Sequence, residues 1–159
     1  MLITYSERWL ITMQAKQYTV LIVDDYEADR FFLREAIRRH APKLHVVGEV
    51  GDGEQVVAYL SGEGQYSDRE TFPLPDILIL DMRMPRMTGL EVLAWLENQN
   101  FPKLKIAVMA DSSSAIYRSK ALELGVEHFF SKLMNSDELI QLVKRLQDEL
   151  ESGEQRRFI

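Results

Sequence analysis

The feature of this sequence that most constrains its fold is the alternation of short apolar runs with longer segments of helical periodicity. The apolar runs are too short for helices, and such runs between helical segments are typical of parallel strands that helices cover on both faces. The predicted strands are Thr19–Val23, Leu44–Glu49, Asp76–Leu80, Lys105–Met109 and Glu127–Ser131. The pattern therefore predicts an α/β fold with a doubly wound, five-stranded parallel sheet.

Helical periodicity predicts a helix after each of these strands. The predicted helices are Glu27–His40, Gln55–Leu60, Gly89–Glu97, Ala115–Leu124 and Ser136 to about Leu150. In the first helix, the residues predicted to face one side are Phe31, Leu33, Ala36 and Ile37. In the last helix, apolar residues recur at helical spacing, namely Leu139, Leu142, Val143, Leu146 and Leu150. Segment Ser61–Pro75 is predicted to be a long loop because it holds two glycines, two prolines and several charges.

Length and composition indicate one globular domain. The chain has 159 residues, and we assign residues 18–151 to the domain, 1–17 to an N-terminal extension and 152–159 to a C-terminal tail. The net charge of −6 argues against nucleic acid as a direct ligand. The absence of cysteine excludes disulfide bonds and thiolate catalysis, and it suits the cytoplasm, where we expect the protein. No apolar run approaches the about 20 residues that cross a bilayer, so we expect no membrane partner.

Charged residues follow three of the predicted strands. Asp24 and Asp25 follow the first strand, Asp81 follows the third and Lys132 follows the fifth. The carboxyl ends of parallel strands meet at one edge of a sheet, so we expect these side chains to share a small volume. Each aspartate alone is an ordinary turn or helix-capping residue. The whole set, at correctly ordered strand ends, indicates a functional site.

Three carboxylates at close range favour a bound cation. Their mutual repulsion raises their pKa values and costs stability. Mg²⁺ is the cation that takes such oxygen ligands together with phosphate oxygens. A carboxylate acts as nucleophile in aspartyl-phosphate chemistry, and a lysine counters the charge on the transferring oxygens. We therefore predict a Mg²⁺ site in which Asp81 is the nucleophile and Lys132 is the countering cation.

These motifs resemble the receiver domains of response regulators in two-component signalling, over residues 18–150. The matching segments are Val20–Asp25, Asp81–Gly89, and Gly125 seven residues before Lys132. The resemblance implies a flavodoxin-like receiver fold and a phosphoprotein in a phosphorelay. It implies no enzyme, beyond Mg²⁺-dependent self-phosphorylation and dephosphorylation of the acceptor aspartate.

The resemblance also assigns roles to individual residues. It implies that a sensor histidine kinase phosphorylates Asp81. It further implies that Asp25 binds Mg²⁺ directly with assistance from Asp24, and that the backbone carbonyl of Arg83 is another metal ligand. The loop segment Gly62–Tyr66 looks like that of stand-alone receivers that partner phytochrome-type and other sensor kinases.

Output is expected to go through another protein. Only about nine residues follow the last predicted helix, so we expect no DNA-binding domain and predict a downstream protein target. The family commonly uses the surface of the fourth helix, fifth strand and fifth helix for dimerisation or docking, which makes a homodimer a candidate assembly.

The sequence departs from the family pattern at the switch. Receivers usually carry Ser or Thr at the end of the fourth strand, and by the Val-x-Ala context we place Met109 there. A thioether cannot donate the hydrogen bond that a hydroxyl gives to a phosphoryl oxygen. One of Ser112–Ser114 nearby could replace that hydroxyl, but we interpret these serines as loop and helix-capping residues. Phe129 takes the position of the family's mobile aromatic residue, and Leu133 replaces the usual proline after Lys132.

Two other functions compete with the phospho-switch. A pseudo-receiver would keep the acidic pocket and signal by constitutive binding, because the switch hydroxyl is missing. A haloacid-dehalogenase-type phosphatase would also use an aspartyl nucleophile in a related sheet. That chemistry requires a second aspartate, as acid/base, two residues after the nucleophile. This chain has Arg83 there, so we predict no turnover of small phosphoesters.

Overall fold

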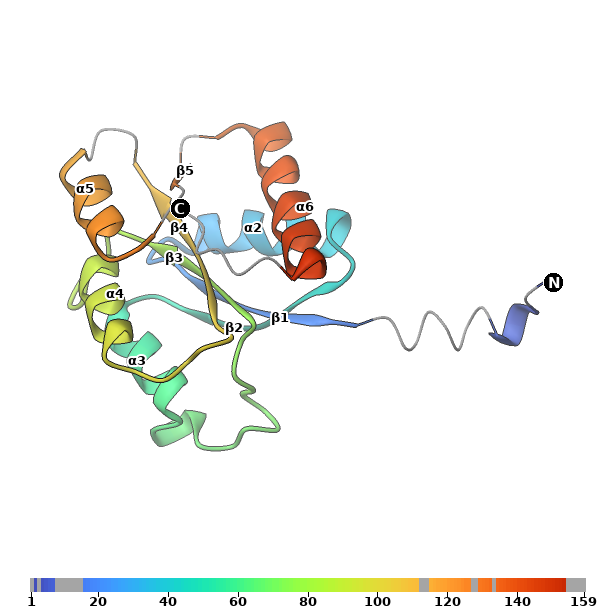
Figure 1. The fold of residues 1–159 in the computed structure, drawn as a ribbon, viewed down its shortest axis with the longest axis horizontal. Coiled ribbons are helices and arrows are strands. Elements are labelled where there is room, and N and C mark those ends of the chain that lie inside the picture. The colour runs from blue at the N-terminus through green and yellow to red at the C-terminus, as the bar shows by residue number, and fades with distance from the viewer. Residues whose placement is uncertain are drawn as a thin grey trace.

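Five parallel strands form one sheet in the computed structural model, which describes residues 2, 4–7, 16–111, 115–126, 129–132 and 134–153. The strand order is β2-β1-β3-β4-β5 (Figure 1). The strands are β1 Tyr18–Val23, β2 Leu44–Val50, β3 Ile77–Asp81, β4 Lys105–Ala110 and β5 Phe129–Ser131. The predicted fold is confirmed, and each of the first four strands lies within one residue of its prediction. The first two residues of the predicted fifth strand, 127–128, lie outside the described residues.

Helices cover both faces of the sheet. The helices are α2 Glu27–His40, α3 Gly53–Ser61, α4 Gly89–Glu97, α5 Ala115–Glu123, α6 Ser136–Ser152 and the short 3-10 helix η1 Gly64–Tyr66. Figure 1 shows α2 and α6 on one side and α3, α4 and α5 on the other. None of the described helices is long and apolar enough to cross a membrane.

Each face of the sheet has its own apolar core. The core under α2 and α6 contains Leu33, Ala36, Ile37, Leu142, Val143, Leu146 and Leu150. The sequence placed these residues on the apolar sides of the two helices, together with Leu139, which is only partly buried against this core, and Phe31. Phe31 is 47% exposed, because it lies on a different side of α2 from the buried stripe at positions 33, 36 and 37.

The segment between α3 and β3 is held by its own side chains. The Arg69 guanidinium donates to the backbone oxygens of Tyr59, Leu60 and Phe72. Two of these oxygens belong to the last turn of α3, so Arg69 adds side-chain hydrogen bonds at the end of this helix. The ring of Tyr66 packs against Tyr59 and Phe72, at 5.0 and 5.2 Å between centroids. The predicted long loop is therefore an ordered segment with η1 inside it.

The loop from β3 to α4 is folded tightly around Gly89. A Cβ atom at Gly89 would lie 2.5 Å from the backbone oxygen of Asp81 and 2.7 Å from the Cα of Met82. The Gly89 N–H donates to the Met82 oxygen at 3.2 Å. Thr88 caps α4 in a capping box with Glu91. The end of β3 and the start of α4 therefore touch at a point where only glycine fits.

Gly89→Ala is predicted to destabilise the fold by about 1–3 kcal/mol, because the added methyl group meets backbone atoms that cannot move independently. Urea denaturation measures this change in the free energy of unfolding. Gly51→Ala is the matched control, since a Cβ there meets only the flexible Arg30 side chain, at 3.9 Å. Equal stability of the two variants would contradict the tight approach at Gly89.

Candidate functional site

The site lies at the carboxyl edge of the sheet, where the chain order reverses. The chain leaves β1 for β2 on one side and later returns to β3 on the other, so β1 and β3 are neighbours. In sheets of this topology the crevice at such a switch point is where ligands bind. Asp24 and Asp25 follow β1, and Asp81 is the last residue of β3. One oxygen from each of these three carboxylates lies within 4.8 Å of the other two.

Asp81 is buried at the end of β3, with 2% of its surface exposed. Its Oδ1 accepts the Arg83 backbone N–H at 3.1 Å, and its Oδ2 accepts from the Lys132 Nζ at 3.1 Å. Burial raises the pKa of Asp81 to about 6, and the negative charge of Asp24 adds to this effect. The Arg83 N–H and Lys132 oppose the rise without cancelling it. Ionisation of Asp81 therefore lowers the stability of the metal-free protein.

Asp24 is held by local backbone contacts while Asp25 is open to solvent. The Asp24 Oδ1 accepts the Tyr26 N–H at 2.9 Å, and the Asp24 backbone oxygen accepts from the Arg30 guanidinium at 2.6 Å. Burial raises the pKa of Asp24, although the Tyr26 N–H and Lys132 lower it. Asp25 is exposed. The pair thus offers one fixed and one accessible carboxylate beside Asp81.

Lys132 joins the strands through its ammonium group. Lys132 comes directly after β5. Its backbone N–H donates to the oxygen of Ala110, the last residue of β4, at 3.0 Å, and this bond ties it to that strand. The Nζ lies 2.9 Å from Asp24 Oδ2 and 3.1 Å from Asp81 Oδ2. Burial lowers the pKa of Lys132, but the hydrogen bonds and charges of Asp24 and Asp81 outweigh it and hold the pKa above its usual range. Lys132 is therefore a permanent cation in the site.

The structure adds contacts that the sequence analysis missed. Asp29, in the first turn of α2, lies 3.4 Å from the Lys132 Nζ through its Oδ2. The Tyr26 ring lies beneath the same ammonium, with its centroid at 5.7 Å. The position of Asp29, five residues after Asp24 at the start of a predicted helix, was the signal available in the sequence. Alone it indicated only a favourable charge at a helix N-terminus.

The donor set suits a hard divalent cation. Asp24, Asp25 and Asp81 supply carboxylate oxygens at close range, which is the ligand chemistry of Mg²⁺ and Mn²⁺. Lys132 supplies one positive charge against three carboxylates, so the cluster keeps a net negative charge. A bound metal ion would neutralise that charge. The Arg83 N–H donates a hydrogen bond to the Asp81 carboxylate. That the Arg83 backbone carbonyl binds the metal stays a prediction.

Met109 and Phe129, the two residues predicted to form the switch, lie on opposite faces of the sheet. Met109 packs in the core under α2 and α6, whereas Phe129 packs against the core under α3, α4 and α5. Ala110 belongs to the same core that Phe129 contacts. β4 ends at Ala110, one residue later than predicted, and side chains alternate along a strand, so its last residue lies on the face of Phe129.

Ala110, the residue that ends β4, also lacks a hydroxyl group. Ala110 offers no side-chain donor, and Met109 faces away from Phe129. Ser112–Ser114 and Leu133 lie outside the described residues. Neither of the two residues that end β4 therefore offers a hydroxyl group that could connect Asp81 to Phe129.

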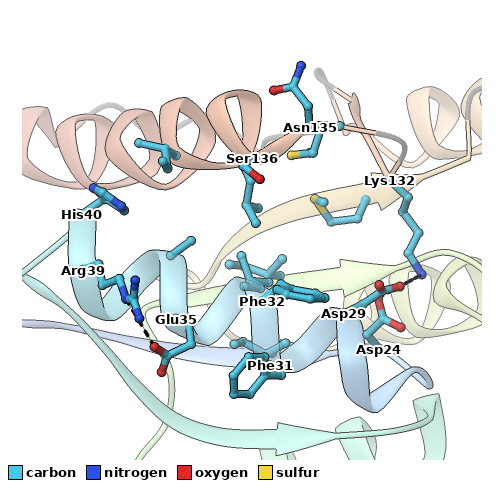
Figure 2. A pocket seen from close by; sticks show the side chains of 18 of the residues that line it. Asp24, Asp29, Phe31, Phe32, Glu35, Arg39, His40, Lys132, Asn135 and Ser136 are labelled. Carbon is cyan, nitrogen blue, oxygen red and sulfur yellow. Dashed lines mark ion pairs between the residues drawn. The ribbon is translucent and has the colours of Figure 1, made fainter.

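An apolar hollow of about 480 Å³ opens from the site between α2 and α6. Figure 2 shows Lys132, Asp24 and Asp29 at one end of it and His40 and Arg39 at the other. Met109 and Ile79 from the sheet also line it. The acidic site is therefore continuous with a groove along α2.

A family model for the response regulator receiver domain matches residues 20–144. The chain therefore belongs to the response regulator receiver domain family. The five-stranded parallel sheet with helices on both faces is the fold of its structural neighbours in this family.

Named relatives place this chain beside both short and long response regulators. Response regulator Rcp1 of Synechocystis is 26% identical over 129 residues, which are 80% of this chain and 85% of Rcp1. Transcriptional regulatory protein DegU of Brevibacillus brevis is 28% identical over 128 residues, which are 79% of this chain and 48% of DegU. The chain thus spans about half the length of DegU and most of the length of Rcp1.

Solved structures support the same comparison. The phosphorylated cyanobacterial phytochrome response regulator RcpA matches with a TM-score of 0.74 and 27% identity, over 87% of this chain and 96% of RcpA. The Mn²⁺-bound form of Rcp1 matches with a TM-score of 0.70 and 25% identity, over 82% of this chain and 92% of Rcp1. A relative with this fold therefore binds a divalent metal.

Removing the charge of Asp81 is predicted to stabilise the metal-free protein. Its pKa of about 6 lies above the about 3.9 of an unfolded aspartate, so the folded state holds the proton more tightly. Stability therefore falls as the pH rises between these two values, and the full cost is present at neutral pH. Asp81→Asn is expected to raise the free energy of unfolding by about 1–3 kcal/mol at neutral pH with chelator, measured by urea denaturation.

The control for this experiment is Asp148→Asn, which removes the same charge from the exposed side of α6 and should leave stability unchanged. Saturating Mg²⁺ is expected to stabilise the wild type and so narrow its difference from Asp81→Asn. An Asp81→Asn protein no more stable than the wild type in chelator would show that the buried carboxylate carries no such cost.

Proposed function

We propose that the protein is a receiver that accepts a phosphoryl group on Asp81 from a histidine kinase and signals through a protein partner. The observation that carries this proposal is the cluster of Asp24, Asp25 and Asp81, with Lys132 bonded to Asp24 and Asp81. A buried nucleophile, an accessible metal-binding carboxylate and a fixed cation are the groups that phosphoryl transfer to aspartate requires.

The chemistry assigns a task to each group. A carboxylate oxygen of Asp81 forms a bond to phosphorus while the phosphorus–nitrogen bond of the donor phosphohistidine breaks, and the bonding electrons stay with the imidazole. Lys132 attracts the phosphoryl oxygens as charge shifts among them. A divalent metal held by Asp24, Asp25 and Asp81 would supply further charge neutralisation. The Arg83 N–H fixes the orientation of the Asp81 carboxylate.

The relatives suggest the class of the donor. RcpA is a cyanobacterial phytochrome response regulator. The response regulator RPA3017, in red light signaling of R. palustris, matches with a TM-score of 0.72 and 28% identity. We propose a phytochrome-type histidine kinase as the phosphodonor of this chain, in the cytoplasm, with Mg²⁺ as the metal.

Phosphorylation is predicted to depend on Asp81 and on the metal. Incubation with Mg²⁺ and acetyl phosphate should add the mass of one phosphoryl group to the wild type, measured by intact mass spectrometry. Asp81→Asn and chelator should each abolish the addition, while Asp148→Asn should not change it. Addition that persists in Asp81→Asn would place the acceptor elsewhere. Steady turnover of small phosphoesters would instead favour the phosphatase.

A second candidate function is a pseudo-receiver that binds partners without a complete phospho-switch. The observation that favours it is Ala110, which offers no hydroxyl on the face where Phe129 packs. A hydrogen bond to a charged group contributes about 1.5–3 kcal/mol. Moving a two-state equilibrium from 1:99 to 99:1 takes about 5.5 kcal/mol, so the loss of one such bond leaves the transition incomplete.

Restoring a hydroxyl at Ala110 is predicted to couple Phe129 to Asp81. In the wild type, beryllofluoride with Mg²⁺ should change the NMR resonances of the Phe129 ring little. In Ala110→Thr the change should be larger, because the hydroxyl can donate to the phosphoryl mimic. Met109→Thr is the matched control, since it places the same side chain on the opposite face.

Met109→Thr is expected to leave Phe129 unresponsive and to lower the free energy of unfolding by about 2 kcal/mol or more, because Met109 is a buried core residue. A Phe129 response in the wild type as large as that in Ala110→Thr would contradict the pseudo-receiver. It would also show that the missing hydroxyl does not limit the switch.

A further inference from the structure

Lys132 has a third acidic partner that neither the metal cluster nor the acceptor role requires. Asp29 comes from α2, whereas Asp24 and Asp81 come from strand ends. Its Oδ2 lies 3.4 Å from the Lys132 Nζ, which is close enough for an ion pair. Figure 2 shows Asp29 and Asp24 on the same side of the Lys132 ammonium, at the end of the hollow between α2 and α6. Lys132 therefore links α2 to the acidic site.

The three carboxylates match the donor capacity of the lysine. An ammonium group carries three N–H donors and no acceptor. In this structure the Lys132 Nζ lies 2.9 Å from Asp24, 3.1 Å from Asp81 and 3.4 Å from Asp29. A phosphoryl oxygen on Asp81 would therefore compete with these carboxylates for the three Lys132 donors.

Asp29 is the partner that holds the lysine least firmly. Asp24 is buried and is fixed by the Tyr26 N–H at 2.9 Å. Asp81 is itself the residue that would carry the phosphoryl group. The Asp29 side chain is 50% exposed and has the longest of the three contacts, so water can replace Lys132 as its partner at little cost.

We propose that Asp29 is a positioning residue that competes with the phosphoryl group for Lys132, so that phosphorylation of Asp81 releases α2 from the site. This inference rests on the proposed function. In the unmodified protein, Asp29 keeps Lys132 drawn toward the first turn of α2. After phosphorylation, the ammonium binds the phosphoryl oxygens and the ion pair to Asp29 is lost.

The release has a defined place in the fold. Asp29 lies about one turn before Phe32, which is 60% exposed and lines the hollow. Tyr26, just before α2, packs its ring against the Lys132 ammonium at 5.7 Å. Loss of the Asp29 contact therefore changes the start of α2, on the face of the sheet opposite to Phe129. This route does not need the hydroxyl that Ala110 lacks.

The test compares Asp29→Asn with Glu27→Gln in the 159-residue protein. Glu27 is also an exposed acidic residue in the first turn of α2, but it is in none of the ion pairs that Lys132 makes in the described part of the chain. Both variants remove one negative charge near the site, and only Asp29→Asn frees Lys132. Beryllofluoride with Mg²⁺ is the probe, and its apparent affinity is measured by NMR titration.

We expect Asp29→Asn to bind beryllofluoride about two- to fivefold more tightly than Glu27→Gln. This fold-change is the size of effect that one half-exposed ion pair produces. Asp29→Glu should restore the wild-type affinity. In the wild type, beryllofluoride should shift the backbone amide resonances of the first turn of α2, and this shift should shrink in Asp29→Asn. Urea denaturation should give similar stabilities for the two charge-removing variants.

Equal affinities of Asp29→Asn and Glu27→Gln would overturn the inference, because the effect would then be one of net charge alone. Weaker binding by Asp29→Asn would also overturn it, since Asp29 would then hold Lys132 in the productive position. Absence of beryllofluoride binding and of acetyl phosphate labelling in the wild type would overturn the proposed function together with this inference. Labelling of the wild type with equal affinities in the two variants would overturn the inference only.

Discussion

The interaction on which the site depends is the bonding of the Lys132 ammonium to the carboxylates of Asp24 and Asp81. These two acids are buried at the ends of adjacent strands, where ionisation is costly without a cation. The backbone of Lys132 is tied to Ala110, so the lysine reaches the acids from the far side of β4. One side chain thus connects the ends of three strands and balances part of the charge that the sheet topology brings together.

The tight turn after Asp81 holds its carboxylate in place beside Lys132. Gly89 lets the start of α4 touch the end of β3, and the Arg83 N–H fixes the Asp81 carboxylate. Farther along the same loop, Arg86 has a left-handed backbone, with φ of 63°, and its guanidinium binds the buried carboxylate of Asp52. Asp52 also caps α3. The loop after β3 is therefore anchored to both α3 and α4.

The sequence predicted the strands and the convergence of Asp24, Asp25, Asp81 and Lys132 because both follow from periodicity and from the geometry of parallel sheets. It placed the end of β4 one residue early, at Met109 instead of Ala110, whose side chain lies on the other face of the sheet. It also failed at Phe31, which lies outside the buried stripe of α2. Asp29 was missed because its contact with Lys132 joins residues far apart in the chain.

The acidic cluster and Lys132 come together although neither of the two residues that end β4 carries a hydroxyl group. The groove along α2 opens from this site and lies on the face of the sheet opposite to Ala110 and Phe129. The most direct measurement is a crystal structure with Mg²⁺ and beryllofluoride. We expect the metal between Asp25 and Asp81, with beryllofluoride on Asp81 Oδ and bonded to Lys132. Metal bound elsewhere, or Asp81 left unmodified with Lys132 unmoved, would contradict a phosphoryl-acceptor site.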